Sequence, residues 1–206
     1  ADTLRESEWT DGCPVAASFD ELAGGIEAAV LAVPTVAHAQ LGVELLRRGI
    51  HLLVEKPIAA TLAEADQLLA AASGKVLAVG HVEFYNPAVE ALLRRCSADR
   101  LRPGFVEVQR LALATPRSLD VDVVLDLMIH DLQILHALDP SPVTEVRATG
   151  IRVLSERVDI ANARIALASG CVATLTASRV SAERVRKLRV FLPQRYFSVD
   201  YQEQEI

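Results

Sequence analysis

The sequence predicts an α/β plus α+β protein with two domains: a partial, doubly wound domain over residues 1–102 and an open, mainly antiparallel sheet domain over residues 103–206. Two observations predict this. In the first part, short apolar runs alternate with helical patterns of about 10–15 residues, which is typical of βαβ units and a parallel sheet. From residue 143 on, strand-like runs follow one another without helices, which favours antiparallel pairing.

The elements of the first part are bounded by capping residues and helix breakers. Pro34 ends the first strand, Gly49 ends the first helix, and Thr61 with Glu64 forms a capping box at the next helix. Each strand is a continuous apolar run, as expected when both faces of a parallel sheet are buried. The predicted elements are strands over 28–33, 50–54 and 76–79, and helices over 36–48, 61–73 and 87–96.

The second part begins near Pro103 with a change of pattern. A strand over 104–113 precedes a helix over 121–138, which Asp139 and Pro140 close. Ser169 and Gly170 are typical of a hairpin turn. The further predicted strands are 143–154, 158–168, 172–179, 187–192 and 196–201.

Composition excludes several classes of protein. The net charge of −6 argues against a nucleic-acid-binding surface, and 51% apolar with 23% charged residues argues against disorder. The longest stretch without a charged residue, 28–43, is interrupted by proline, histidine and glutamine, so no membrane-spanning helix is predicted. The three cysteines are far apart and form no CxxC pair, which predicts neither a zinc site nor disulfides and favours a cytoplasmic location: Cys13, Cys96 and Cys171.

Glu55-Lys56-Pro57 follows a predicted parallel strand, at the edge where open α/β sheets bind ligands. A lysine there can bridge a cofactor hydroxyl and a substrate oxygen, and its charge favours ionisation of a reacting alcohol. The alternative is an ordinary surface lysine at a strand end.

Asp126 and His130 are four residues apart in a helical, otherwise apolar run, so they share a helix face. Ionisable groups in such a run need partners. The carboxylate can orient the imidazole, and the pair can then remove an alcohol proton. A structural Asp–His pair is the alternative. A metal site is not predicted, because no third ligand lies at a suitable spacing in the sequence.

Other candidates are less specific. His81, Tyr85 and Asn86 follow the third strand, although Asn86 before a proline is also a good helix start. Arg110 and Arg117 can bind an anionic substrate or simply be solvated. A further basic group reads as a solvated strand edge: Arg179, Arg184, Arg186, Lys187 and Arg189.

Together these motifs resemble the glucose–fructose oxidoreductase / inositol dehydrogenase / MocA (Gfo/Idh/MocA) family, whose first domain is a Rossmann-type NAD(P)-binding domain. The resemblance covers residues 18–201. Its motifs are Ala32-Val33-Pro34-Thr35 with His38, Val54-Glu55-Lys56-Pro57 with Glu64-Ala65, Gly80-His81 with Tyr85-Asn86-Pro87, and Asp126-Leu127-Met128-Ile129-His130-Asp131.

The resemblance implies hydride transfer between NAD or NADP and a secondary hydroxyl of a sugar or nucleotide sugar. It also implies a homo-oligomer formed through the sheet face. The site residues it implies are catalytic Lys56, Asp126 and His130; cofactor-binding Val33, Pro34, Thr35, His38, Glu55 and Lys56; and substrate-binding His81, Tyr85, Asn86 and Arg117. The position of His38 inside a predicted helix favours a role in packing over a role in cofactor binding.

Within the family, residues 80–89, 120–131 and 178–181 look most like UDP-N-acetylglucosamine 3-dehydrogenases. A UDP group would need cationic partners, which Arg117 or the basic group can supply. Two alternatives stay open. One is a dehydrogenase of a free sugar or of a cyclitol such as myo-inositol, and the other is a non-catalytic, NAD(P)-responsive regulator.

One departure from the family stands out. Its members open with a strand and a Gly-x-Gly-x-x-Gly turn that holds the pyrophosphate, and the sequence contains no such turn. The chain also begins at Ala1 rather than Met. We therefore expect an N-terminally truncated fragment that binds NAD(P) poorly and is poorly active, and NAD is not distinguished from NADP.

Overall fold

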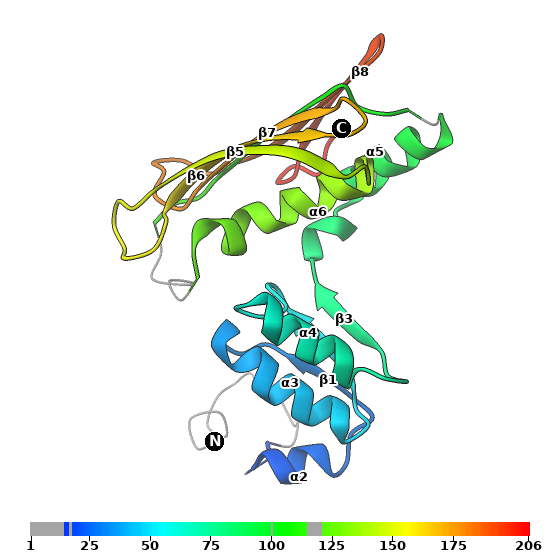
Figure 1. Cartoon of the computed structure of the whole chain (residues 1–206), viewed down its shortest axis with the longest axis vertical. Helices are drawn as coiled ribbons and strands as arrows, with labels where there is room; N and C mark the ends of the chain where they lie inside the picture. Colours follow the sequence, from blue (N-terminus) through cyan, green and yellow to red (C-terminus); the bar gives the residue numbers. More distant parts are fainter. Residues whose placement is uncertain (1–14, 17, 100, 115–120) are drawn as a thin grey trace. The chain divides into compact units, whose positions relative to one another are not determined.

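The computed structural model of the chain describes residues 15–16, 18–99, 101–114 and 121–206 (Figure 1). Contacts divide the chain into two compact units, Ala1–Gly80 and His81–Ile206. The division comes earlier than the boundary predicted at residue 103. The reason is helix α5 (Pro87–Ala98), whose Val89 and Leu92 are buried in the hydrophobic core of the second unit.

The first unit contains a three-stranded sheet whose strands are parallel, as predicted, and lie in the order β1-β2-β3. The strands are β1 (Ala28–Leu31), β2 (His51–Glu55) and β3 (Leu77–Gly80), and the helices are α2 (Phe19–Ala23), η2 (Thr35–Ala37), α3 (His38–Arg47) and α4 (Leu62–Ala71). The predicted capping box starts α4, where the Thr61 hydroxyl accepts from the Glu64 amide at 3.2 Å and the Glu64 carboxylate accepts from the Thr61 amide at 3.0 Å.

The core of this unit lies on one face of the sheet, where α3 and α4 run side by side (Figure 1). Leu52, Val54 and Leu68 are fully or almost fully buried there. The prediction that both faces are buried is wrong for this chain, because Val30 is 66% and Leu53 38% exposed on the opposite face. Residues of all three strands line an apolar hollow of about 290 Å³ on the sheet.

The second unit is a six-stranded sheet in the order β5-β6-β7-β4-β8-β9, with α5 and α6 on one face (Figure 1). Every pair is antiparallel except β4–β7, so the expected mainly antiparallel sheet is confirmed. The strands are β4 (Phe105–Leu111), β5 (Val143–Ile151), β6 (Ile160–Leu167), β7 (Val172–Ser178), β8 (Val185–Leu192) and β9 (Arg195–Asp200), and the helices are η3 (Val82–Tyr85), η4 (Val124–Met128) and α6 (Ile129–Leu138).

Alternation along the strands separates the two faces of this sheet. Val106, Leu175 and Val190 are fully buried on the helix-covered face. The predicted hairpin joins β6 to β7, and Gly170 adopts φ +91° there, a conformation that favours glycine. In the parts of the chain that the structure describes, no helix combines the length and apolarity needed to cross a membrane.

Candidate active site

In the first unit, the predicted cofactor residues lie where the parallel strands end. Pro34 and Thr35 follow β1, and Pro34 is exposed. Glu55 ends β2, and Lys56 follows it, partly exposed, before a cis peptide bond to Pro57. The carboxyl ends of adjacent parallel strands share one edge of a sheet, which is where open α/β folds bind ligands.

His38 links the two loops at this edge. Its side chain is 1% exposed, with Nδ1 2.9 Å from the Pro57 carbonyl oxygen and Nε2 2.9 Å from the Val33 carbonyl oxygen. Carbonyl oxygens only accept hydrogen bonds, so the His38 ring is the donor at this edge. His38 thus holds the backbone of the loops after β1 and β2 from inside the unit.

Gly80 makes room for the Glu55 carboxylate, a role that the sequence did not reveal. Glu55 pairs with Gly80 in the β2–β3 register. A Cβ atom at Gly80 would lie 3.1 Å from Glu55 Oε1, closer than side chains normally approach. A side chain at position 80 would therefore require the Glu55 carboxylate to shift by a few tenths of an ångström.

In the second unit, Asp126 and His130 lie where a π-helical turn meets α6. The predicted unbroken helix over 121–138 is wrong in this detail, because η4 is a π helix. The carboxylate of Asp122 accepts from the Val124 and Leu125 amides, both at 3.0 Å, and so caps the start of this wide turn. Asp126 is partly buried and His130 is 7% exposed. Such π turns often occur at functional sites.

The second unit also brings His81 next to His130. Their ring centroids are 5.9 Å apart and the ring planes meet at 88°, an edge-to-face pair. Tyr85 is 71% exposed. The Asn86 side chain instead serves the fold: its oxygen caps α5 through the Ala88 amide at 3.0 Å, and its nitrogen donates to a backbone carbonyl 2.9 Å away.

Two of the predicted arginines are buried rather than solvated. Arg110 is 2% exposed and forms a bidentate ion pair with Asp131 of α6, so it is neither solvated nor available to an anionic substrate. Arg179 is 6% exposed and donates to Asp159 at 2.9 Å, to the Val121 carbonyl oxygen at 2.8 Å and to the Ser155 hydroxyl at 3.2 Å. The predictions of a solvated strand edge and of a diphosphate contact are therefore both wrong for Arg179. Arg117 lies outside the described residues. In the segments covered by the structure, no cluster of three or more His, Cys, Asp or Glu could hold a metal ion.

Asp159 organises the loop between β5 and β6. Its carboxylate accepts from the Ser155 hydroxyl at 2.7 Å and from the Val153, Leu154 and Ser155 amides at 2.7–3.0 Å, in addition to Arg179. The Ser155 hydroxyl, then the backbone N–H groups and Arg179, hold the pKa of Asp159 well below its usual range.

This lowered pKa predicts a pH-dependent contribution to stability. The contribution is complete above the unfolded-state pKa of about 3.9 and is lost as the pH falls below it. We therefore expect Asp159→Asn to lower the Tm by several degrees at neutral pH, with the difference from wild type shrinking below about pH 4. Thermal unfolding followed by circular dichroism from neutral to acidic pH measures this. Asp66→Asn, at an exposed position, is the control, and a difference that is independent of pH would contradict the prediction.

Comparison with known proteins follows the same division of the chain. Residues 3–81 match the profile of an oxidoreductase family with an NAD-binding Rossmann fold, Gfo/Idh/MocA. Residues 96–195 match the profile of the Gfo/Idh/MocA C-terminal domain. The chain belongs to the Gfo/Idh/MocA family. Its three parallel strands are therefore part of a Rossmann domain, and its six-stranded sheet is the C-terminal domain of this family.

Relatives in the Gfo/Idh/MocA family include sugar and cyclitol dehydrogenases. UDP-N-acetylglucosamine 3-dehydrogenase of Acidithiobacillus ferrooxidans is 38% identical over 191 residues, which cover 92% of this chain and 60% of that protein. Myo-inositol dehydrogenase Hyg17 of Streptomyces leeuwenhoekii is 34% identical over 151 residues, covering 68% and 46%. The chain thus spans about 60% of the length of the first relative.

Solved structures agree on the fold. The structure of the Acidithiobacillus ferrooxidans enzyme superposes with a TM-score of 0.86 over 93% of this chain and 63% of that one. The WlbA dehydrogenase of Bordetella pertussis, solved with NADH and UDP-GlcNAcA, superposes with a TM-score of 0.84 at 18% identity over 96% and 63%. At that identity, the second likeness concerns the fold alone.

Proposed function

We propose that the chain belongs to an NAD(P)-dependent dehydrogenase of the UDP-N-acetylglucosamine 3-dehydrogenase type, which oxidises a secondary hydroxyl of a nucleotide sugar. The observation that supports this most is the His81–His130 pair in the second unit, in a chain 38% identical to such an enzyme. Because the chain spans about 60% of that relative, the activity is proposed for the polypeptide encoded by the complete reading frame.

The proposed chemistry removes a proton from the hydroxyl oxygen and a hydride from the carbon that carries it. Nicotinamide, when bound, accepts the hydride. His130 accepts the hydroxyl proton, and Asp126, one turn earlier, orients the imidazole. The Lys56 ammonium stabilises the negative charge that develops on the substrate oxygen.

The residues at the first unit's strand ends suit a dinucleotide, NAD or NADP. Pro34 and Thr35 offer a loop beside β1, and Glu55 offers a carboxylate that can accept a hydroxyl hydrogen bond. We assign His38 and Val33 to the support of this edge, since the two are joined through the His38 ring. We assign to Lys56, which is partly exposed, the role of contacting both the cofactor and the substrate.

For the substrate we propose contacts from His81 and Tyr85, whose side chains lie on one short segment, η3 and its N-cap. Arg117 stays a predicted contact to the diphosphate of the nucleotide sugar. We propose a structural role for Asn86, because its amide is engaged in the cap of α5.

The test is a turnover assay on the product of the complete reading frame. Nicotinamide reduction is followed by absorbance with NAD or NADP and a panel of UDP-N-acetylglucosamine, free N-acetylglucosamine and myo-inositol. Reduction with the UDP-sugar alone is the expected result. Turnover of myo-inositol or of the free sugar instead would favour the second candidate, a cyclitol or sugar dehydrogenase. The similarity to the myo-inositol dehydrogenase Hyg17 supports this candidate. Tight NAD(P) binding without any turnover would favour a regulator.

We also propose that the protein forms a homo-oligomer through the sheet face that the helices leave uncovered. Phe105, Phe191 and Tyr196 are 37%, 38% and 52% exposed on that face. The Phe191 ring centroid lies 5.7 Å from that of Phe105 and 5.0 Å from that of Tyr196, with the ring planes tilted by 47° and 43°. Clustered exposed aromatic side chains are typical of interfaces.

The oligomer makes a direct prediction. Phe191→Glu should place a charge in the interface and convert the oligomer to monomers, as measured by size-exclusion chromatography with light scattering. Leu154→Glu, at a 70% exposed position in the loop after β5, is the control that should leave the mass unchanged. An unchanged mass for Phe191→Glu would place the interface elsewhere.

A further inference from the structure

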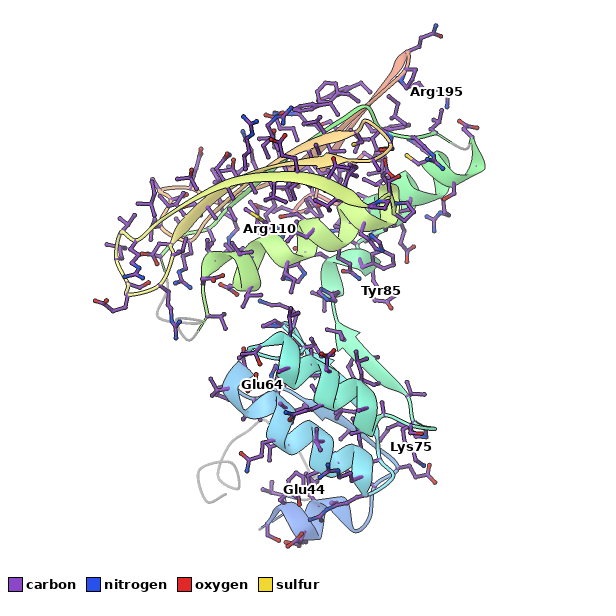
Figure 2. All side chains as sticks on the ribbon, in the orientation of Figure 1. Glu44, Glu64, Lys75, Tyr85, Arg110 and Arg195 are labelled. Carbon is purple, nitrogen blue, oxygen red and sulfur yellow. The ribbon has the colours of Figure 1, made fainter. Side chains whose placement is uncertain are left out.

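Arg110 is the largest fully buried side chain among the described residues. It lies in β4, between β7 and β8, and its side chain points to the helix-covered face, between the sheet and α6 (Figure 2). A guanidinium in such a place is tolerated only when its charge and its N–H groups are matched. Its partners therefore indicate why the charge is there.

The first partner is Asp131, on the sheet-facing side of α6 and 2% exposed. Arg110 Nε and Nη2 donate to the two oxygens of Asp131 at 2.8 Å and 2.7 Å, a bidentate pair. Tyr201 completes this side: its hydroxyl donates to Asp131 at 3.3 Å, and its ring lies 4.7 Å from the guanidinium carbon.

The second partner is Glu83, in η3. Arg110 Nη1 donates to Glu83 Oε1 at 2.9 Å, and Arg186 from β8 donates to the same oxygen at 3.0 Å. Two arginines thus face two carboxylates, and the charges in the cluster balance. Burial works against the charged guanidinium, but the nearby Asp131 and Glu83 carboxylates outweigh it and raise the pKa of Arg110 well above its usual range.

The two carboxylates occupy informative positions in the chain. Asp131 directly follows His130 on α6, and Glu83 is the second residue after His81. One planar guanidinium therefore holds both segments that carry the edge-to-face histidines, whose ring centroids are 5.9 Å apart. The fork geometry of arginine fixes direction as well as distance, which a lysine ammonium does not.

We propose that Arg110 is a positioning residue: it clamps α6 and η3 to the central strand and so sets the relative orientation of His81 and His130. The clamp itself depends only on the contacts above. Its effect on catalysis rests on the proposed function, in which His130 is the base.

The matched comparison is between two buried arginines of the same sheet unit. Arg110→Lys keeps a cation but loses the fork toward Asp131. Arg179→Lys makes the same change at the other buried Arg–Asp pair, which holds the β5–β6 loop. Glu83→Gln is a second, milder variant that releases only the η3 side of the clamp, so the test survives if Arg110→Lys does not fold.

The structural readout is NMR of the histidine rings in the chain itself. Wild type should give a nuclear Overhauser contact between the His81 and His130 ring protons. We expect this contact to be lost in Arg110→Lys, weakened in Glu83→Gln and kept in Arg179→Lys. A contact that persists in both Arg110→Lys and Glu83→Gln, or that is lost equally in Arg179→Lys, would overturn the proposal.

The kinetic readout uses the product of the complete reading frame. Misplacement of a catalytic group by about 1 Å can lower the rate about 10²-fold. We therefore expect kcat to fall about 10- to 100-fold in Arg110→Lys, with KM for the nicotinamide cofactor unchanged. An equal fall in Arg179→Lys would refute the positioning role. Wild-type protein without turnover would refute the proposed function instead, and the NMR comparison would still decide whether Arg110 is the clamp.

Discussion

His130→Asn is expected to lower kcat for the proposed sugar oxidation by about 10²–10⁴-fold, the usual contribution of a general base. Asparagine keeps a similar size and hydrogen-bonding capacity but cannot accept the hydroxyl proton. His130 is 7% exposed beside the His81 ring, so a substitution of similar size should disturb packing little. Steady-state kinetics with the complete reading frame measure the effect, and cofactor affinity should stay as in wild type.

The control lies on the same helix. His136→Asn changes an exposed histidine of α6 that has no assigned role, and it should leave kcat unchanged. If His130→Asn retained wild-type turnover, another group would be the base, and His130 would be a structural partner of His81. Comparable losses in both variants would point to damage to α6 rather than to the chemistry.

The second large effect concerns stability. Asp131→Ala removes the bidentate partner of a fully buried guanidinium. Breaking a buried ion pair from one side typically costs about 3–5 kcal/mol, and Glu83 still binds Arg110, so we expect about 3 kcal/mol. Urea unfolding of the chain followed by fluorescence or circular dichroism measures this as a lower midpoint with little change in slope.

Two comparisons test the cause. Glu90→Ala breaks an exposed i,i+4 pair with Arg94 on α5 and should cost no more than about 0.5 kcal/mol. Replacing both members of the buried pair, as Arg110→Met with Asp131→Leu, should recover much of the loss, because no unpaired charge remains. A cost for Asp131→Ala as small as that for Glu90→Ala would mean that the pair contributes nothing to stability.

Most local elements of this protein could be predicted from residues that are close together in the chain. Apolar runs marked β1, β2 and β3, the Thr61–Glu64 box marked the start of α4, and Gly170 marked the β6–β7 hairpin. Each signal depends on residues close together in the chain, whose backbone preferences act before any distant contact forms. The family motifs were visible for the same reason, since each is a short contiguous run.

Contacts between residues far apart in the chain, in contrast, became visible only in the folded structure. Three examples are contacts between residues at least 19 positions apart in the chain: Arg110 with Asp131, His81 with His130, and His38 with the Pro57 carbonyl oxygen. A charged residue such as Arg110 has the same local pattern whether it is solvated or paired. Its state depends on β4 entering the middle of the sheet, and that position is set by long-range packing rather than by neighbours along the chain.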